Sequence, residues 1–190
     1  MEPPSSPPAT TLLLVERAVA PIAFPDPALE QVLRSHLFPP GSKPEACHRQ
    51  GGVRYAYNRF DLDGDRRPET LVALLGRQSC GPEGCPVLLL KEFGRRTLPL
   101  QMIPGFHTTL VVSESRSQGW RDLILPDPKN PGGSPPKRLT HNGSGYPERI
   151  SDSRVSLLSQ PTKGVGALML KASPFVVQGH RLICPVQGGR

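Results

Sequence analysis

Proline and glycine set the strongest limit on what this chain can fold into. The 190 residues include 24 prolines and 19 glycines, and both residue types interrupt regular elements, because proline lacks a backbone donor and glycine is conformationally free. Hydrophobic residues make up 36% of the chain, which is enough for one core at this length. We therefore expect one domain built from short elements and many turns.

One amphipathic helix is expected near the N-terminus. Asp26 is suited to cap a helix over 26–37, in which Pro27 occupies the first turn. The residues that share one face of this helix are Leu29, Val32, Leu33 and His36. The prolines at 39 and 40 end it.

Strands are expected from residue 53 onward, where apolar residues alternate with a period near two. The expected strands cover 53–58, 70–75, 87–90, 97–102, 108–112, 122–125 and 138–140. Each is short and bounded by glycine, proline or polar turns, a spacing that indicates an antiparallel meander. Beyond Pro147 the signal weakens, and 155–158 and 167–170 are candidate strands of an accessory segment.

These patterns predict an α+β fold in which one N-terminal helix packs on an antiparallel sheet of about five to seven strands. Both ends of the chain are rich in proline. The expected organisation is a disordered or extended lead over 1–24, an α+β domain over 25–150 and a C-terminal accessory segment over 151–190.

An acidic stretch between the first two expected strands gives the clearest indication of a chemical function. Asp61, Asp63, Asp65 and Glu69 occupy relative positions 1, 3, 5 and 9 of this stretch, residues 61–69, which we call the acid loop. With that spacing a tight loop directs alternate side-chain oxygens toward one centre, as loops that bind hard cations do. The four residues are therefore candidate calcium ligands.

A turn held by hydrogen bonds alone is the alternative for the acid loop. Calcium loops of this kind usually have glycine after the third acid, where φ is positive, and this chain has Arg66. The twelfth position, a glutamate in EF-hands, is Val72. Arg66 and Arg67 would neutralise the acids without a metal. Asp61 and Asp63 would then accept hydrogen bonds from backbone amides.

The four cysteines form an even set that allows more than one disulfide connectivity. Cys80 and Cys85 bracket the turn-forming sequence Gly-Pro-Glu-Gly, which favours bringing their sulfurs together. A bond between Cys47 and Cys184 would tie the C-terminus to the start of the folded domain. Zinc is the alternative, although the cysteines lack the second close pair that zinc sites usually have.

Disulfide bonds would imply an oxidising compartment, periplasmic or extracellular. No signal peptide is readable, because Glu16 and Arg17 cut short the apolar run at 12–15, so either a leader has been removed or the cysteines are reduced in the cytosol. No membrane span is expected, since no run of about 18 apolar residues occurs. The formal charge of +7 is spread over single residues and pairs, which favours a solvated basic surface over a nucleic-acid site. The expected partner is a protein or an envelope ligand.

Four motifs in a fixed order give the segment 57–147 a resemblance to known proteins. Tyr57 to Glu69 has the form Tyr-x-x-Phe-Asp-Leu-Asp-x-Asp-x-x-x-Glu, and Cys80 to Cys85, Gly119 to Leu123 and Gly145 to Pro147 follow it. This order resembles a broad group of uncharacterised bacterial proteins, mostly exported or lipid-anchored, of Gram-negative bacteria and cyanobacteria. The resemblance implies export, a Cys80–Cys85 bridge and an α+β fold, but no activity. The acid loop by itself is similar to the calcium loops of integrin-type β-propeller repeats.

Two functions of different class are consistent with these features. The preferred hypothesis is a non-enzymatic exported binding or inhibitor-like module, because the sequence contains no recognisable catalytic constellation, and we assign no catalytic residues. The alternative is a metal-dependent hydrolase that acts on envelope material through the acid loop. Such an enzyme needs an open coordination position beside a general base, which no cluster of histidine or glutamate outside the loop supplies.

Overall fold

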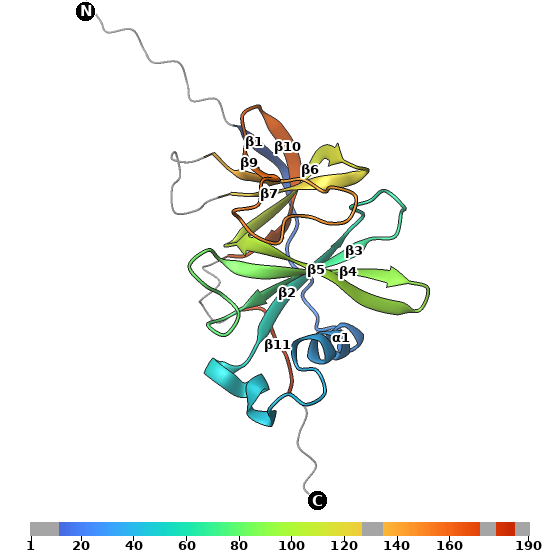
Figure 1. Ribbon diagram of the computed structural model, residues 1–190, viewed down its shortest axis with the longest axis vertical. Helices are drawn as coiled ribbons and strands as arrows, with labels where there is room; N and C mark the ends of the chain where they lie inside the picture. Colours follow the sequence, from blue (N-terminus) through green and yellow to red (C-terminus); the bar gives the residue numbers. More distant parts are fainter. Residues whose placement is uncertain (1–11, 127–134, 172–177, 185–190) are drawn as a thin grey trace, which may run out of the picture.

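Three layers are stacked in the computed structural model of the protein (Figure 1). A six-stranded sheet, sheet A, lies over a five-stranded sheet, sheet B, and helix α1 (Pro27–Leu37) covers the opposite face of sheet B. The structure describes residues 12–126, 135–171 and 178–184. The predicted α+β class, with more strand than helix, is confirmed.

Sheet A has the strand order β1, β10, β6, β7, β8, β9. The β1–β10 pair is parallel and the other pairs are antiparallel. The bounds of its strands are β1 (Leu13–Ala18), β6 (Thr109–Ser117), β7 (Trp120–Leu125), β8 (Lys137–Leu139), β9 (Val155–Leu157) and β10 (Thr162–Met169).

Sheet B has the order β11, β2, β3, β4, β5, and all its pairs are antiparallel. Its strands are β2 (Arg54–Phe60), β3 (Glu69–Leu75), β4 (Cys85–Phe93), β5 (Arg96–Phe106) and β11 (His180–Arg181). A 3-10 helix, η1 (Pro44–Gly51), connects α1 to β2.

Helix α1 begins and packs as its sequence predicts. The carboxylate of Asp26 accepts hydrogen bonds from the backbone N–H groups of Ala28 and Leu29, at 3.0 and 3.1 Å, which satisfies donors that the first turn leaves open. Leu29 and Leu33 are buried against sheet B. His36, expected on the same face, is exposed instead.

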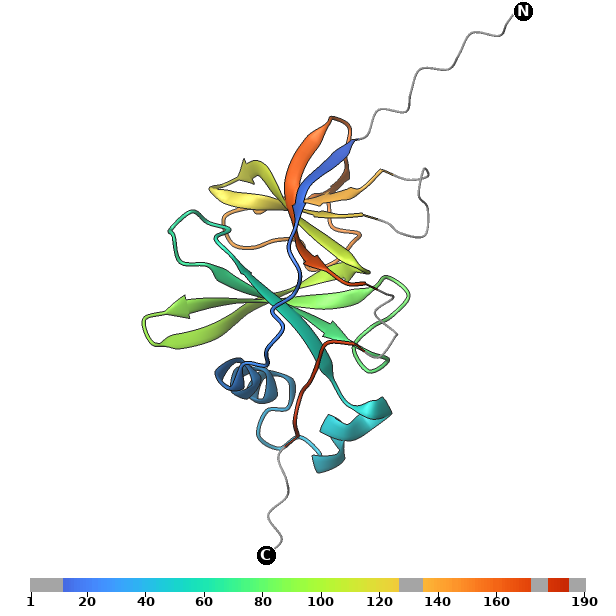
Figure 2. The same ribbon diagram turned by 180° about the vertical axis from the view of Figure 1, so that it is seen from behind.

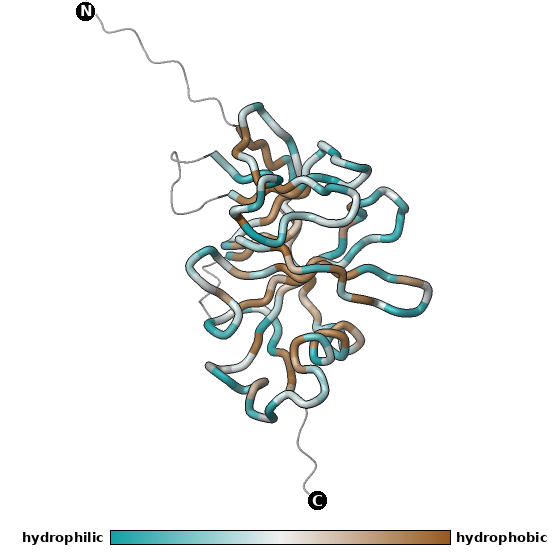
Figure 3. The backbone as a smooth tube through the Cα atoms, viewed as in Figure 1, coloured by the Kyte–Doolittle hydropathy of each residue, from teal (hydrophilic) through white to brown (hydrophobic). Residues whose placement is uncertain are grey.

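Strand β3 of sheet B is buried along its whole length and contributes side chains to two hydrophobic cores. Leu71, Ala73 and Leu75 point into the core between the two sheets. Val72 and Leu74 point into the core under α1, because successive side chains of a strand lie on opposite faces. The apolar segments accordingly gather along the crossing strands and the hydrophilic ones at the loop ends (Figure 3).

The strands form two sheets rather than the single meander expected from the sequence. Both faces of β3 are apolar, and one short helix can bury only one of them. Sheet A packs against the other face. Residues 13–18, expected to belong to a disordered or extended lead, form β1 beside β10 (Figures 1 and 2). The segment 151–190, expected to be accessory, contributes β10 to the interior of sheet A.

Candidate functional site

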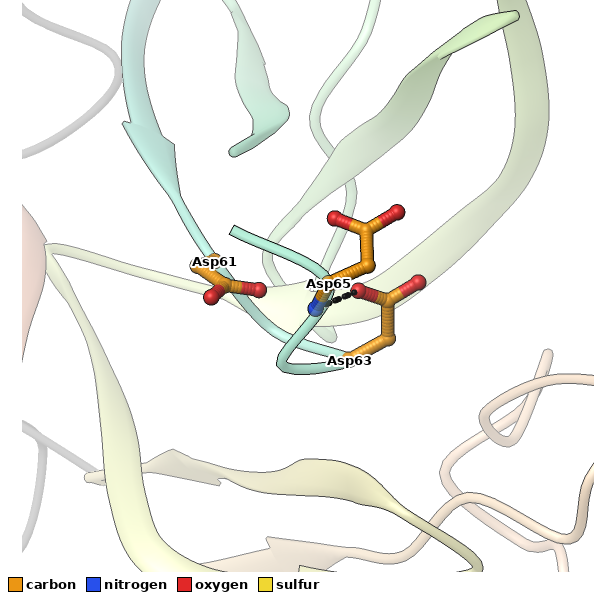
Figure 4. A group of neighbouring side chains, drawn as sticks. All are labelled: Asp61, Asp63 and Asp65. Atoms are coloured by element: carbon orange, nitrogen blue, oxygen red, sulfur yellow. Dashed lines mark hydrogen bonds between the residues drawn. The ribbon is translucent and has the colours of Figure 1, made fainter. Parts of the chain in front are cut away.

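The acid loop joins β2 to β3, and its last residue, Glu69, opens β3. Asp61, Asp63 and Asp65 each place one carboxylate oxygen within 4.8 Å of the others. Figure 4 shows the three side chains around one tight turn of the chain. Their spacing thus gathers three of the four predicted metal ligands, while Glu69 lies outside this group.

Hydrogen bonds to backbone amides build the turn. Asp61 accepts them from Gly64 and Arg66, at 2.7 and 3.1 Å, and Asp63 accepts one from Asp65 at 3.0 Å (Figure 4). Arg66 has a φ of 68°, in the left-handed region that was expected after the third acid. An arginine adopts this conformation because the Asp61 carboxylate holds its amide.

Lys91 of β4 supplies the positive charge of the acid loop. Its ammonium group donates to Asp63, to Asp65 at 2.9 Å and to Glu69 at 3.0 Å. The sequence prediction assigned charge compensation to Arg66 and Arg67, and it missed Lys91. No signal in the sequence reveals this lysine, because it follows an apolar run within β4 and lies more than twenty residues from each of its three partners.

Glu69 is the buried member of the charged group. Its side chain has no solvent exposure, and Oε2 accepts a hydrogen bond from the Leu62 amide at 2.8 Å. Burial raises the pKa of Glu69, since removal from water disfavours the charged form. Burial also lowers the pKa of Lys91, but its hydrogen bonds to Asp63, Asp65 and Glu69 outweigh this effect and leave the pKa raised. The bond to Lys91 lowers the pKa of Asp65.

The acid loop is also attached to sheet A. The Leu62 carbonyl accepts hydrogen bonds from the backbone amide of Arg121, at 2.8 Å, and from the Arg116 guanidinium, at 3.2 Å. The Lys91 ammonium lies 5.5 Å from the centre of the Trp120 ring, a cation–π distance. The loop therefore links the two sheets.

Trp120 belongs to an aromatic cluster that packs against the core between the sheets. Its ring stacks on His141, with ring centres 4.6 Å apart, and Tyr146 meets both rings edge-on. The Tyr146 hydroxyl donates to the Arg121 carbonyl at 2.6 Å. Trp120 is thus a packing residue.

Both expected disulfide bonds are present, Cys47–Cys184 and Cys80–Cys85. The described residues include no free cysteine, so zinc ligation by these thiols is excluded in the folded protein. Cys47–Cys184 ties η1 to the segment after β11, across a sequence separation of 137 residues. Cys80–Cys85 closes the turn between β3 and β4.

A groove borders the Cys80–Cys85 turn. Its volume is about 530 Å³, and it is lined by the turn itself and by Pro104 and Gly105 of β5. We call it the disulfide groove. The Gly84 Cα lies so close to β5 that a Cβ there would be 2.5 Å from the Phe106 carbonyl oxygen. The disulfide and this backbone contact together fix one wall of the groove.

No family model matches the chain, and searches of curated proteins and of solved structures also returned no match. Within the described ranges, no helix combines the length and the apolar character that a membrane crossing requires.

Proposed function

We propose that this protein is a non-enzymatic binding module that works in an oxidising compartment, periplasmic or extracellular, and binds a polypeptide segment of a partner protein in the disulfide groove. The observation that carries this proposal is a groove of about 530 Å³ whose wall is closed by the Cys80–Cys85 bond. Ligand sites commonly have volumes of this size and are largely preformed. The two disulfide bonds support the compartment.

The lining of the groove favours a polypeptide ligand. Proline rings from Pro82, Pro86 and Pro104 offer apolar surface, and Glu83 offers one carboxylate. Apolar side chains beside one basic residue would complement such a surface. A preformed wall also lowers the ordering cost of binding, because the turn is already held by the disulfide.

The acid loop supports a structural role over a catalytic one. Lys91 and four backbone amides occupy oxygens of its aspartates, and Glu69 is buried beneath them. A hydrolytic metal needs an open coordination position and a base beside it. The acidic side chains are instead engaged within the loop and with β4, and the Leu62 carbonyl of the loop is bonded to sheet A.

A second candidate function is a divalent cation site, with metal-dependent hydrolysis of envelope material as its extension. The grouping of Asp61, Asp63 and Asp65 within 4.8 Å favours it. Peptidoglycan fragments, esters and phosphoesters are the substrates to screen, with and without divalent metal. Turnover that requires the metal, and that disappears in a folded Asp63→Ala variant, would replace the binding proposal with this one.

A matched pair of glycine substitutions tests the disulfide groove. Gly84→Ala introduces a methyl group against Phe106 and must shift the wall, whereas Gly94→Ala, also at positive φ, meets nothing within 4 Å. Selection from a displayed peptide library on the immobilised protein should return sequences that bind Gly94→Ala like the parent. Binding to Gly84→Ala should be at least about tenfold weaker. No selected sequence, or equal binding to both variants, contradicts the proposal.

A further inference from the structure

A small polar pocket lies on sheet A, far from the acid loop in the sequence and separate from the disulfide groove. Its volume is about 160 Å³. The polar residues of its lining are Ser115, Arg138, Ser156, Ser159, Gln160 and Thr162. They come from β6, β8, β9 and β10 and from the turn between β9 and β10.

Strand register places this pocket on the face of sheet A that is turned away from sheet B. Arg138 pairs with Ile124 on one side and with Ser156 on the other. Ile124 packs with Leu158 in a separate outer cluster, whereas Leu123 packs in the core between the sheets. Because directly paired residues share a face, Arg138 and Ser156 lie on the outer face with Ile124.

Asp122 shares that face, since it lies two residues before Ile124 on β7. It is fully buried, and its Oδ2 atom accepts hydrogen bonds from Nε of Arg138, at 2.8 Å, and from Nη2. This fixes the guanidinium, whose side chain stays 33% exposed and lines the pocket. The other oxygen, Oδ1, is buried and accepts no hydrogen bond from the described residues.

Asp122 is not among the residues that line the pocket, so it acts on the pocket through Arg138. The carboxylate also neutralises Arg138, which leaves the pocket without the net positive charge that an anion needs. The serine and threonine hydroxyls and the Gln160 amide both donate and accept. A volume of about 160 Å³ corresponds to roughly five water molecules.

We propose that this outer pocket binds a small, neutral, polyhydroxylated ligand of the size of one sugar ring. Sugar hydroxyls would accept hydrogen bonds from Arg138 and exchange hydrogen bonds with the lining hydroxyls and the Gln160 amide. This site goes beyond the proposed function, and it does not depend on the disulfide groove.

Titration of the ¹⁵N-labelled full chain with glucose, galactose, N-acetylglucosamine and inorganic phosphate, followed by amide chemical shifts, tests the proposal. At least one sugar should give saturable shifts at residues 115, 138, 156–160 and 162, with a dissociation constant on the order of millimolar. The proposal is overturned if none of the three sugars produces shifts at these residues, or if only phosphate does.

Two serine variants separate ligand contact from fold. Ser156→Ala removes a lining hydroxyl from an exposed residue and should weaken the same sugar about fivefold or more. Ser153→Ala, also exposed and outside the pocket, should leave the affinity unchanged. Equal affinity for the parent, Ser156→Ala and Ser153→Ala would mean that the sugar binds elsewhere and would refute the site.

Discussion

The Lys91 ammonium lies 3.0 Å from Oε1 of Glu69, a carboxylate with no solvent exposure. The same ammonium holds Asp63 and Asp65 on its outer side. One lysine of β4 thus neutralises the start of β3 and the turn before it, where the acid loop meets sheet A.

Lys91→Met should destabilise the protein by about 3 kcal/mol. The substitution keeps most of the apolar stem but leaves Glu69 charged and buried without its cation, and breaking such a pair typically costs this much. Urea unfolding at neutral pH measures the change. A loss below about 1 kcal/mol would show that the ammonium is not needed by Glu69.

Adding Glu69→Gln to Lys91→Met should restore part of the lost stability. The amide removes the buried charge and retains an oxygen that can accept from the Leu62 amide. The double variant should therefore be more stable than the sum of the two single changes predicts. Strict additivity would contradict the direct interaction between the two side chains.

The two disulfide bonds should contribute very different amounts to stability. Cys47–Cys184 closes a sequence separation of 137 residues and Cys80–Cys85 one of 5, so the chain-entropy relation gives about 5 and about 2 kcal/mol respectively. Paired serine substitutions, followed by thermal and urea unfolding, test this order. A larger loss of stability on removal of Cys80–Cys85 than on removal of Cys47–Cys184 would contradict this order.

Stability should fall as the pH drops below about 6.5 because of His141. Burial, together with the nearby Arg154 guanidinium, lowers its pKa below the ordinary 6.5. As the pH falls, His141 is therefore protonated in the unfolded chain before it is protonated in the folded chain. The stabilisation is complete above pH 6.5 and is lost as the pH falls through the lower pKa that His141 has in the folded state.

A His141→Gln variant should show a weaker pH dependence than the parent across this range. Trp120, the only tryptophan, stacks on His141, and its fluorescence provides the unfolding signal. Parallel pH profiles for the parent and the variant would assign the effect to another group.

Local signals in the sequence were sufficient for most elements. The cap at Asp26, the alternation in β2 and the turns around β3 and β4 operate over a few residues, and these elements lie where they were expected. Strand β1 was missed because most of its side chains are exposed, and its partner β10 lies more than a hundred residues away. Parallel pairing over such a distance leaves no local pattern.

The same contrast applies to the acid loop. The spacing of Asp61, Asp63 and Asp65 is local and predicted their grouping. Whether the three aspartates face a metal ion or a lysine depends on the register of β4 against β3. In this register Leu90 pairs with Thr70, which places Lys91 beside Glu69. Sequence spacing within the loop contains no information on that register.

Thermal unfolding with and without millimolar calcium tests most directly whether Lys91 serves as the cation of the acid loop. We expect an unchanged melting temperature for the parent and a calcium-dependent increase for Lys91→Met, since binding to the folded state alone raises its stability. An increase of several degrees for the parent, abolished by Asp61→Asn, would contradict the account and establish a metal site.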